Sequence, residues 1–123
     1  MLHFEYIEFD SPDLPGSGKE FMDQKFLDLL DKARAEAQIP FKITSGFRTP
    51  EYNIDLKKRG YAVAKNSAHM QGLAADIAVT SSANRLIIIE SLLYVGFRRL
   101  GIGKGFIHVD LSKTKAQDVV WVY

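Results

Sequence analysis

The chain has 123 residues, 46% of them hydrophobic and 25% charged, and its 16 basic and 15 acidic side chains leave a net charge of +1. This length and balance predict one globular domain, residues 1–123, with a buried core. The small net charge gives no support to a nucleic-acid partner. The lack of cysteine excludes disulfides and a thiolate zinc site.

The N-terminal residues do not pair a basic segment with a long apolar run, so no signal peptide is expected. The longest apolar run, 86–97, is interrupted by Glu90 and is too short to cross a bilayer. We therefore expect synthesis in the cytoplasm and no insertion into a membrane.

The first third of the chain predicts a loop, a helix and a strand. Residues 8–18 are rich in turn formers and predict a loop. Ser17 and Glu20 have the spacing of a capping box, and apolar residues at helical intervals predict a helix over 18–37. The β-branched stretch 41–45 then predicts a short strand.

A second helix is predicted to begin where Thr49 stands before Pro50, the pattern of a helix cap followed by its first residue. This helix should run to about Arg59 and end at Gly60. Residues 61–72 predict a loop.

The second half of the chain predicts four strands and one helix: strand 73–79, helix 82–96, and strands 98–102, 106–111 and 119–123. Helices and strands mix without regular alternation, and short glycine-containing connections join the late strands. The fold class is therefore α+β, with a small, mainly antiparallel sheet and helices packed on one side.

Two of these strands each carry one polar and one apolar face. His108 and Asp110 share a face of the strand 106–111, and Asp76 shares a face of its own strand with two small alanines. Burial of the apolar faces against the helices would present these three polar side chains together, above space left by the alanines.

His69 can join this group, because Gly72 permits a tight turn that returns the loop to the start of the strand. Convergence of His69, Asp76 and His108 would supply two imidazoles and one carboxylate, a donor set that suits Zn²⁺. Three protein ligands leave a fourth position for water, as in catalytic zinc sites.

Three segments resemble motifs of the zinc D-Ala-D-Ala carboxypeptidase family, which includes phage endolysins and shares its fold with the Hedgehog signalling domain. SAHMQGLAAD (67–76) resembles the S-x-H-x-x-G-x-A-x-D motif, and FIHVD (106–110) resembles the motif that supplies the third zinc ligand. SGFRTPEYN (45–53) resembles the upstream arginine segment. The three motifs stand in the family's order.

The resemblance implies roles for individual residues. His69, Asp76 and His108 would bind zinc, and Arg48 would hold the carboxylate of the substrate peptide. Ser67 would either contact a ligand or shape its loop, and the sequence does not separate these two roles.

The proton-transfer group follows less directly from the resemblance. Several relatives carry an acid three residues before the third ligand, where this chain has Gly105. Asp110 is our candidate, either as general base or as a partner that orients a ligand imidazole, and Glu51 is the second candidate. The aromatic residues Phe106, Trp121 and Tyr123 are interpreted as core or sheet-edge residues.

The resemblance predicts a zinc metallopeptidase that acts on peptidoglycan stem peptides, either as a D-Ala-D-Ala carboxypeptidase or as an endolysin-type endopeptidase. We expect a monomer that reaches the cell wall after phage or prophage lysis, or as part of a virion. The first alternative is a non-catalytic zinc-containing binding module on the same fold. The second, a metal-dependent phosphoesterase, is disfavoured by the lack of a glycine-rich phosphate loop and a basic groove.

Overall fold

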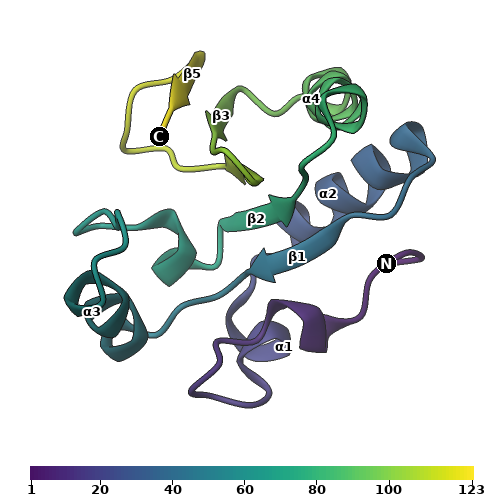
Figure 1. Ribbon diagram of the computed structural model, residues 1–123. Helices are drawn as coiled ribbons and strands as arrows, with labels where there is room; N and C mark the ends of the chain where they lie inside the picture. Colours follow the sequence, from purple (N-terminus) through teal and green to yellow (C-terminus); the bar gives the residue numbers. More distant parts are fainter.

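The computed structural model describes residues 1–123 and contains one five-stranded sheet with helices around it (Figure 1). The α+β fold class with a mainly antiparallel sheet is confirmed. The helices, including two short 3₁₀ turns (η), are η1 (Tyr6–Phe9), α1 (Ser17–Phe21), α2 (Gln24–Ala37), α3 (Pro50–Lys58), η2 (Ala68–Gln71) and α4 (Ser82–Val95). The strands are β1 (Lys42–Ser45), β2 (Ala74–Ala78), β3 (Arg99–Ile102), β4 (Phe106–Asp110) and β5 (Val119–Val122).

The strand order is β1-β2-β4-β3-β5. All neighbouring pairs are antiparallel except β3 and β5, which run parallel. In the central pair, Asp76 of β2 lies directly opposite His108 of β4, and Gly101 of β3 lies opposite His108 on the other side. The register therefore places the polar positions of the two central strands side by side on one face.

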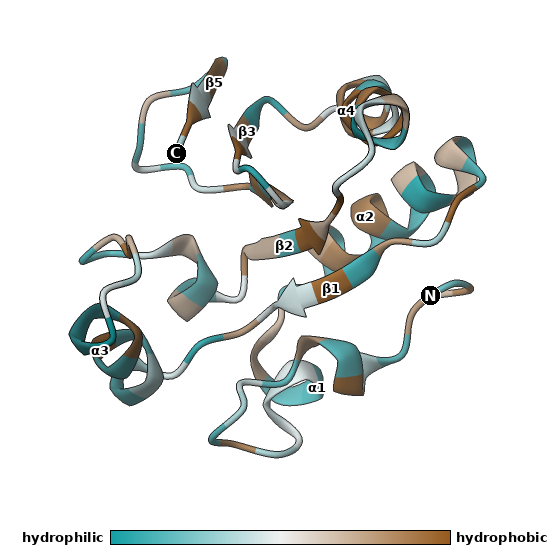
Figure 2. Cartoon of the chain, in the orientation of Figure 1, coloured by the Kyte–Doolittle hydropathy of each residue, from teal (hydrophilic) through white to brown (hydrophobic).

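The opposite face of the sheet forms the core. Five of its side chains are fully buried: Ala75, Ile77, Leu100, Ile107 and Val109. They belong to one apolar cluster with buried side chains of α2 and α4, and both helices contain brown, hydrophobic residues in Figure 2. Burial of each larger aliphatic side chain contributes about 1.5–3 kcal/mol, so this layer fixes the orientation of the polar face.

None of the helices combines the length and apolar character needed to cross a bilayer.

The single helix predicted over 18–37 is wrong, because the chain breaks it into α1 and α2. Met22 is extended, and the Asp23 carboxylate caps α2 by accepting a hydrogen bond from the Phe26 amide. The Asp23 amide donates to the distant Gly72 carbonyl at 2.9 Å. The predicted capping box also fails, since Gly16 precedes the helix and Ser17 is its first residue.

The other elements follow the sequence closely. The Thr49 hydroxyl caps α3 and accepts from the Tyr52 amide, with Pro50 as the first helical residue. Gly96 ends α4 in the left-handed conformation. The predicted loop 61–72 contains one short element, η2, at its end.

The N-terminal segment braces the chain between β1 and α3. The Phe47 amide donates to the Phe9 carbonyl at 2.9 Å, and the Thr49 hydroxyl donates to Asp13 at 2.6 Å. A Cβ at Gly46 would lie 2.6 Å from the Cα of Phe9, so only glycine permits this close approach. The brace fixes the segment that carries Arg48.

Candidate metal centre

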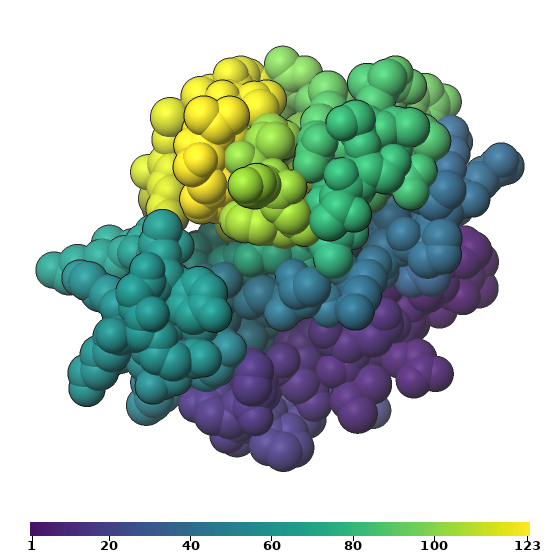
Figure 3. Space-filling view, viewed as in Figure 1, coloured from purple at the N-terminus to yellow at the C-terminus, as the bar shows by residue number.

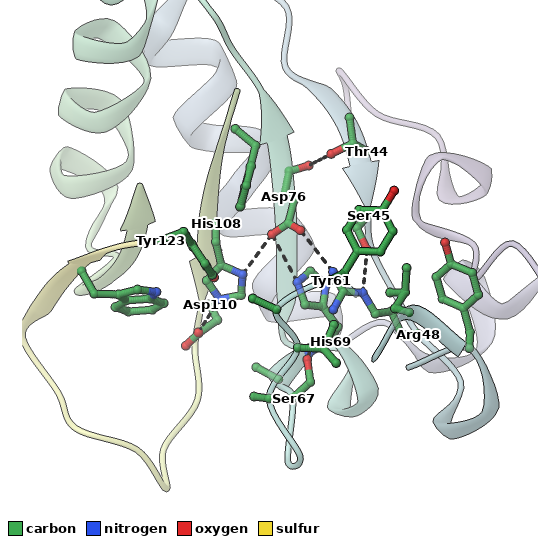
Figure 4. Close-up of a pocket in the computed structure, with 18 of the residues that line it drawn as sticks. Thr44, Ser45, Arg48, Tyr61, Ser67, His69, Asp76, His108, Asp110 and Tyr123 are labelled. Carbon is green, nitrogen blue, oxygen red and sulfur yellow. Dashed lines mark hydrogen bonds and ion pairs between the residues drawn. The ribbon is translucent and has the colours of Figure 1, made fainter. Parts of the chain in front are cut away.

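Three side chains converge at the centre of the polar face: His69 from η2, Asp76 from β2 and His108 from β4. Asp76 Oδ1 lies 3.2 Å from Nε2 of His69 and 3.0 Å from Nδ1 of His108. One potential ligand atom from each residue lies within 4.8 Å of the others. Figure 4 shows the two rings directed at the same carboxylate. The structure thus brings together all three residues expected to bind zinc.

Each imidazole is oriented through its other ring nitrogen. His69 Nδ1 donates to the Gly46 carbonyl at 2.8 Å, and His108 Nε2 donates to Asp110 Oδ2 at 2.7 Å. This leaves Nε2 of His69 and Nδ1 of His108 to face Asp76. Metal-binding histidines commonly donate their second nitrogen to a carbonyl or carboxylate in this way, so the donor set fits a divalent metal ion.

Burial and neighbouring charges shift the pKa values of this group in different directions. Burial lowers the pKa of His69. Burial alone would also lower the pKa of His108, but hydrogen bonds to Asp110 and Asp76 outweigh it and raise that pKa. Burial would raise the pKa of Asp76, yet hydrogen bonds from both histidines hold it well below the ordinary range. The carboxylate is therefore ionised and available as a ligand at neutral pH.

Acid should destabilise the metal-free protein through Asp110. Hydrogen bonds from His108 and Arg99 overcome the effect of burial and lower its pKa from 3.8 to about 2. A lowered pKa gives stability that is present above pH 3.8 and is lost as the pH falls through about 2, amounting to about 2 kcal/mol. The free energy of unfolding, measured in chelator, should fall between about pH 5 and about pH 2, and it should fall less in the Asp110→Asn variant than in the unaltered protein. An equal fall in both proteins would contradict the assignment.

Arg48 and Ser67 both lie at the candidate centre and already have partners within the chain. Arg48 Nε donates to the Ser45 hydroxyl at 2.9 Å, and Nη2 lies 3.2 Å from Asp76 Oδ2. A β-bulge in β1 shifts Ser45 into register with Asp76, and bulges commonly redirect side chains beside active sites. The Ser67 hydroxyl accepts from the His69 amide and caps η2, which favours the loop-shaping role.

The two candidates for proton transfer lie in different surroundings. Asp110 borders the groove, but its side chain is only 1% exposed and both its oxygens accept hydrogen bonds from within the chain. Glu51 is exposed on α3 and is not among the residues that line the groove. Gly105 lines the groove without a side chain.

The centre forms the floor of a groove of about 940 Å³. Figure 3 shows a hollow between the teal segment around residues 55–65 and the yellow C-terminal strand. One wall contains Tyr52 and Tyr61, and the other contains Trp121 and Tyr123. Trp121 lies on an edge strand and Tyr123 directly follows it, in agreement with the interpretation as sheet-edge residues, but that interpretation did not place them in the groove. The register of the sheet puts Trp121 on the polar face, because Gly101 pairs with both His108 and Trp121, and no local sequence pattern gives this register.

Arg99 is a further residue at this centre that the sequence patterns did not single out. It is 6% exposed and lies in β3 on the same face as Gly101. Its guanidinium pairs with Asp110 at 2.7 Å. The signal in the sequence was a cation at a strand position whose alternation directs it to the polar face.

Comparisons with known proteins identify the family of the chain and a solved structure with a similar fold. A family model described as peptidoglycan L,D-endopeptidase MepK matches residues 13–116. The solved structure of the L-Ala D-Glu endopeptidase ChiX of Serratia marcescens superposes with a TM-score of 0.62 and 15% sequence identity, covering 76% of this chain and 82% of that chain. That likeness concerns the fold. No curated protein matches the chain. Since the family model covers most of the chain, including every residue of the candidate centre, the protein belongs to the peptidoglycan L,D-endopeptidase MepK family, within the zinc DD-peptidase and Hedgehog-like group.

Proposed function

We propose that this protein is a zinc-dependent endopeptidase that hydrolyses a peptide bond within peptidoglycan stem peptides. The observation that carries the proposal is the meeting of His69, Asp76 and His108, within 4.8 Å, on the floor of an open groove. The family supports a peptidase that acts on peptidoglycan.

Zinc is the metal that we favour for this centre. Two imidazole nitrogens and one carboxylate oxygen are the protein ligands of catalytic zinc sites that keep a fourth position open. Both histidines have hydrogen-bond acceptors behind them, Gly46 and Asp110, which fix the nitrogen that each presents. When bound, zinc would supply a nucleophilic hydroxide near neutral pH and polarise the scissile carbonyl.

The groove favours an endopeptidase over a carboxypeptidase. A volume of about 940 Å³ between two aromatic walls can hold several residues of a peptide on both sides of the centre. Arg48, the expected carboxylate anchor, already uses Nε and Nη2 for Ser45 and Asp76. Its remaining Nη1 group can still donate to a substrate carbonyl, which places the peptide without requiring a terminal carboxylate.

The remaining side chains prepare the site for hydrolysis. Asp110 accepts from His108 Nε2 on one oxygen and from Arg99 Nε and the Ser112 amide on the other. These partners support an orienting role for Asp110 rather than proton abstraction. Trp121 and Tyr123 line the groove, with the Trp121 ring 5.5 Å from that of His108, so a peptide bound there would be shielded from bulk water on that side.

Digestion of purified peptidoglycan tests the proposed function. The zinc-loaded protein should release new amino groups, and mass analysis of the fragments should locate the cut inside the stem peptide. Removal of the metal with a chelator should abolish release, and added zinc should restore it. Release of free D-Ala alone would support the carboxypeptidase alternative.

A non-catalytic binding module is the second candidate, and Gly105 is the observation that favours it. A protein that binds zinc and peptidoglycan but releases no amines from muropeptides would support this candidate and exclude the peptidase. Action at the cell wall after phage or prophage lysis, or as a virion component, stays a prediction, as does the monomeric state.

A further inference from the structure

Arg99 forms the most extensive buried ion-pair contact beside the candidate centre. Its Nε donates to Asp110 Oδ1 at 2.7 Å, and Nη2 approaches Asp110 Oδ2 at 3.4 Å. Nη1 donates to the Ala116 carbonyl. The side chains of Arg99 and Asp110 are 7% and 1% exposed. The ion pair is therefore shielded from water, and its stability depends strongly on the geometry of its hydrogen bonds.

The same carboxylate is the acceptor that orients His108. Asp110 Oδ2 accepts from His108 Nε2 at 2.7 Å, while the Ser112 amide donates to Oδ1 at 2.9 Å. Arg99 approaches both oxygens and so limits rotation of the carboxylate. With Nε2 committed to Asp110, His108 presents Nδ1 to Asp76, 3.0 Å away.

We propose that Arg99 is a positioning residue of the metal centre, which acts through Asp110 to hold His108 in the orientation that presents Nδ1 to the metal. The proposal rests on the metal site of the proposed function, but it requires only metal binding and not peptidase activity. Loss of Arg99 leaves Asp110 buried without its cation, and the carboxylate then turns to other donors.

Arg99 also connects the centre to the groove wall. Its guanidinium carbon lies 4.9 Å from the centroid of the Trp121 ring, and Trp121 lies 5.5 Å from the ring of His108. A Cβ at Gly101 would come within 2.7 Å of the Trp121 ring, so glycine makes room for this stacking. Arg99 thus contacts three parts of the site: Asp110, which orients His108; the Trp121 ring in the groove wall; and Ala116, in the loop between β4 and β5.

Zinc affinity of Arg99 variants tests the proposal. Arg99→Met should lower the affinity, measured by chelator competition, by about 10–100-fold, the usual effect of losing a partner that orients a ligand. It should also change the visible absorption spectrum of the cobalt-substituted protein, which reports ligand geometry. Arg99→Lys keeps the charge but not the planar fork, and should fall between Arg99→Met and the unaltered protein.

Arg98 provides the matched control, because it is the preceding residue and pairs with Asp118 at the surface. Arg98→Met should leave zinc affinity and the cobalt spectrum unchanged. A double variant, Arg99→Met with Asp110→Asn, should lose little more affinity than Asp110→Asn alone, since both substitutions break the same chain of contacts.

Three results would overturn the proposal. They are an unchanged affinity and spectrum in a folded Arg99→Met protein, an equal loss in Arg98→Met, and fully additive losses in the double variant. If the Arg99→Met variant shows no cooperative unfolding, and so is not folded, the zinc affinity and cobalt spectrum of the Arg99→Lys variant decide the test instead. Failure of the peptidase assay with zinc binding intact refutes the proposed function and leaves this test standing, whereas failure of the unaltered protein to bind zinc refutes both.

Discussion

Replacing His69 with alanine should abolish both zinc binding and peptidoglycan hydrolysis. The ring supplies one of three converging ligand atoms, and two ligands do not hold zinc in a catalytic geometry. Metal-ion catalysis contributes several kcal/mol of transition-state stabilisation, so kcat/KM should fall by at least about a thousandfold. The measurements are metal content, expected near one zinc per unaltered chain, and amine release from muropeptides.

His3 offers a control for this substitution, since it is exposed and lies outside the centre. His3→Ala should keep full zinc content and activity. Thermal unfolding of both variants in chelator separates loss of a ligand from loss of the fold. A folded His69→Ala protein that retains stoichiometric zinc and full activity would remove the basis of the proposed metal site.

Replacing Gly72 with alanine should destabilise the protein by about 3 kcal/mol or more, the range of combined backbone strain and overpacking. Gly72 has a φ of 70°, in the left-handed region. A Cβ there would lie 2.0 Å from the Phe21 carbonyl oxygen and 3.0 Å from the Cα of Met22, and backbone atoms cannot yield without moving the chain. The free energy of unfolding in denaturant, measured in chelator, gives the effect without a contribution from metal.

Gly105→Ala is the matched control for this effect. A Cβ at Gly105 meets nothing within 4 Å, so its unfolding free energy should stay within about 0.5 kcal/mol of that of the unaltered protein. Because η2 ends at Gly72, the Gly72 variant should also bind zinc more weakly, while Gly105→Ala should not. Similar stabilities for the two variants would show that the turn after His69 tolerates a side chain.

The central part of the site was predictable because strand alternation is a strong local rule. Alternation placed Asp76 and His108 on polar faces, and the structure pairs these two residues directly across β2 and β4. The caps at Thr49 and Gly96 were predictable for a similar reason, since they depend only on neighbouring backbone.

Features that depend on distant segments were not predictable from local patterns. The break between α1 and α2 is stabilised by the hydrogen bond from the Asp23 amide to Gly72, almost fifty residues away in the sequence. The helical spacing of apolar residues continues across the break between α1 and α2, so it did not indicate that the helix ends there. The contact of Arg99 with Asp110 likewise depends on the register of β3 and β4. The parallel pairing of β5, which brings Trp121 over Gly101, is fixed by tertiary contacts alone.

The candidate metal ligands and the aromatic wall of the groove lie on different strands of the sheet. The adjacent interior strands β2 and β4 carry Asp76 and His108, whereas the edge strand β5 carries Trp121, with Tyr123 directly after it. An edge strand has a single hydrogen-bonded neighbour and accepts substitution more readily than an interior one. Sequence variation on β5 therefore changes one side of the groove while the two interior strands that hold Asp76 and His108 keep their pairing, except at Trp121, whose ring lies against Arg99 and His108.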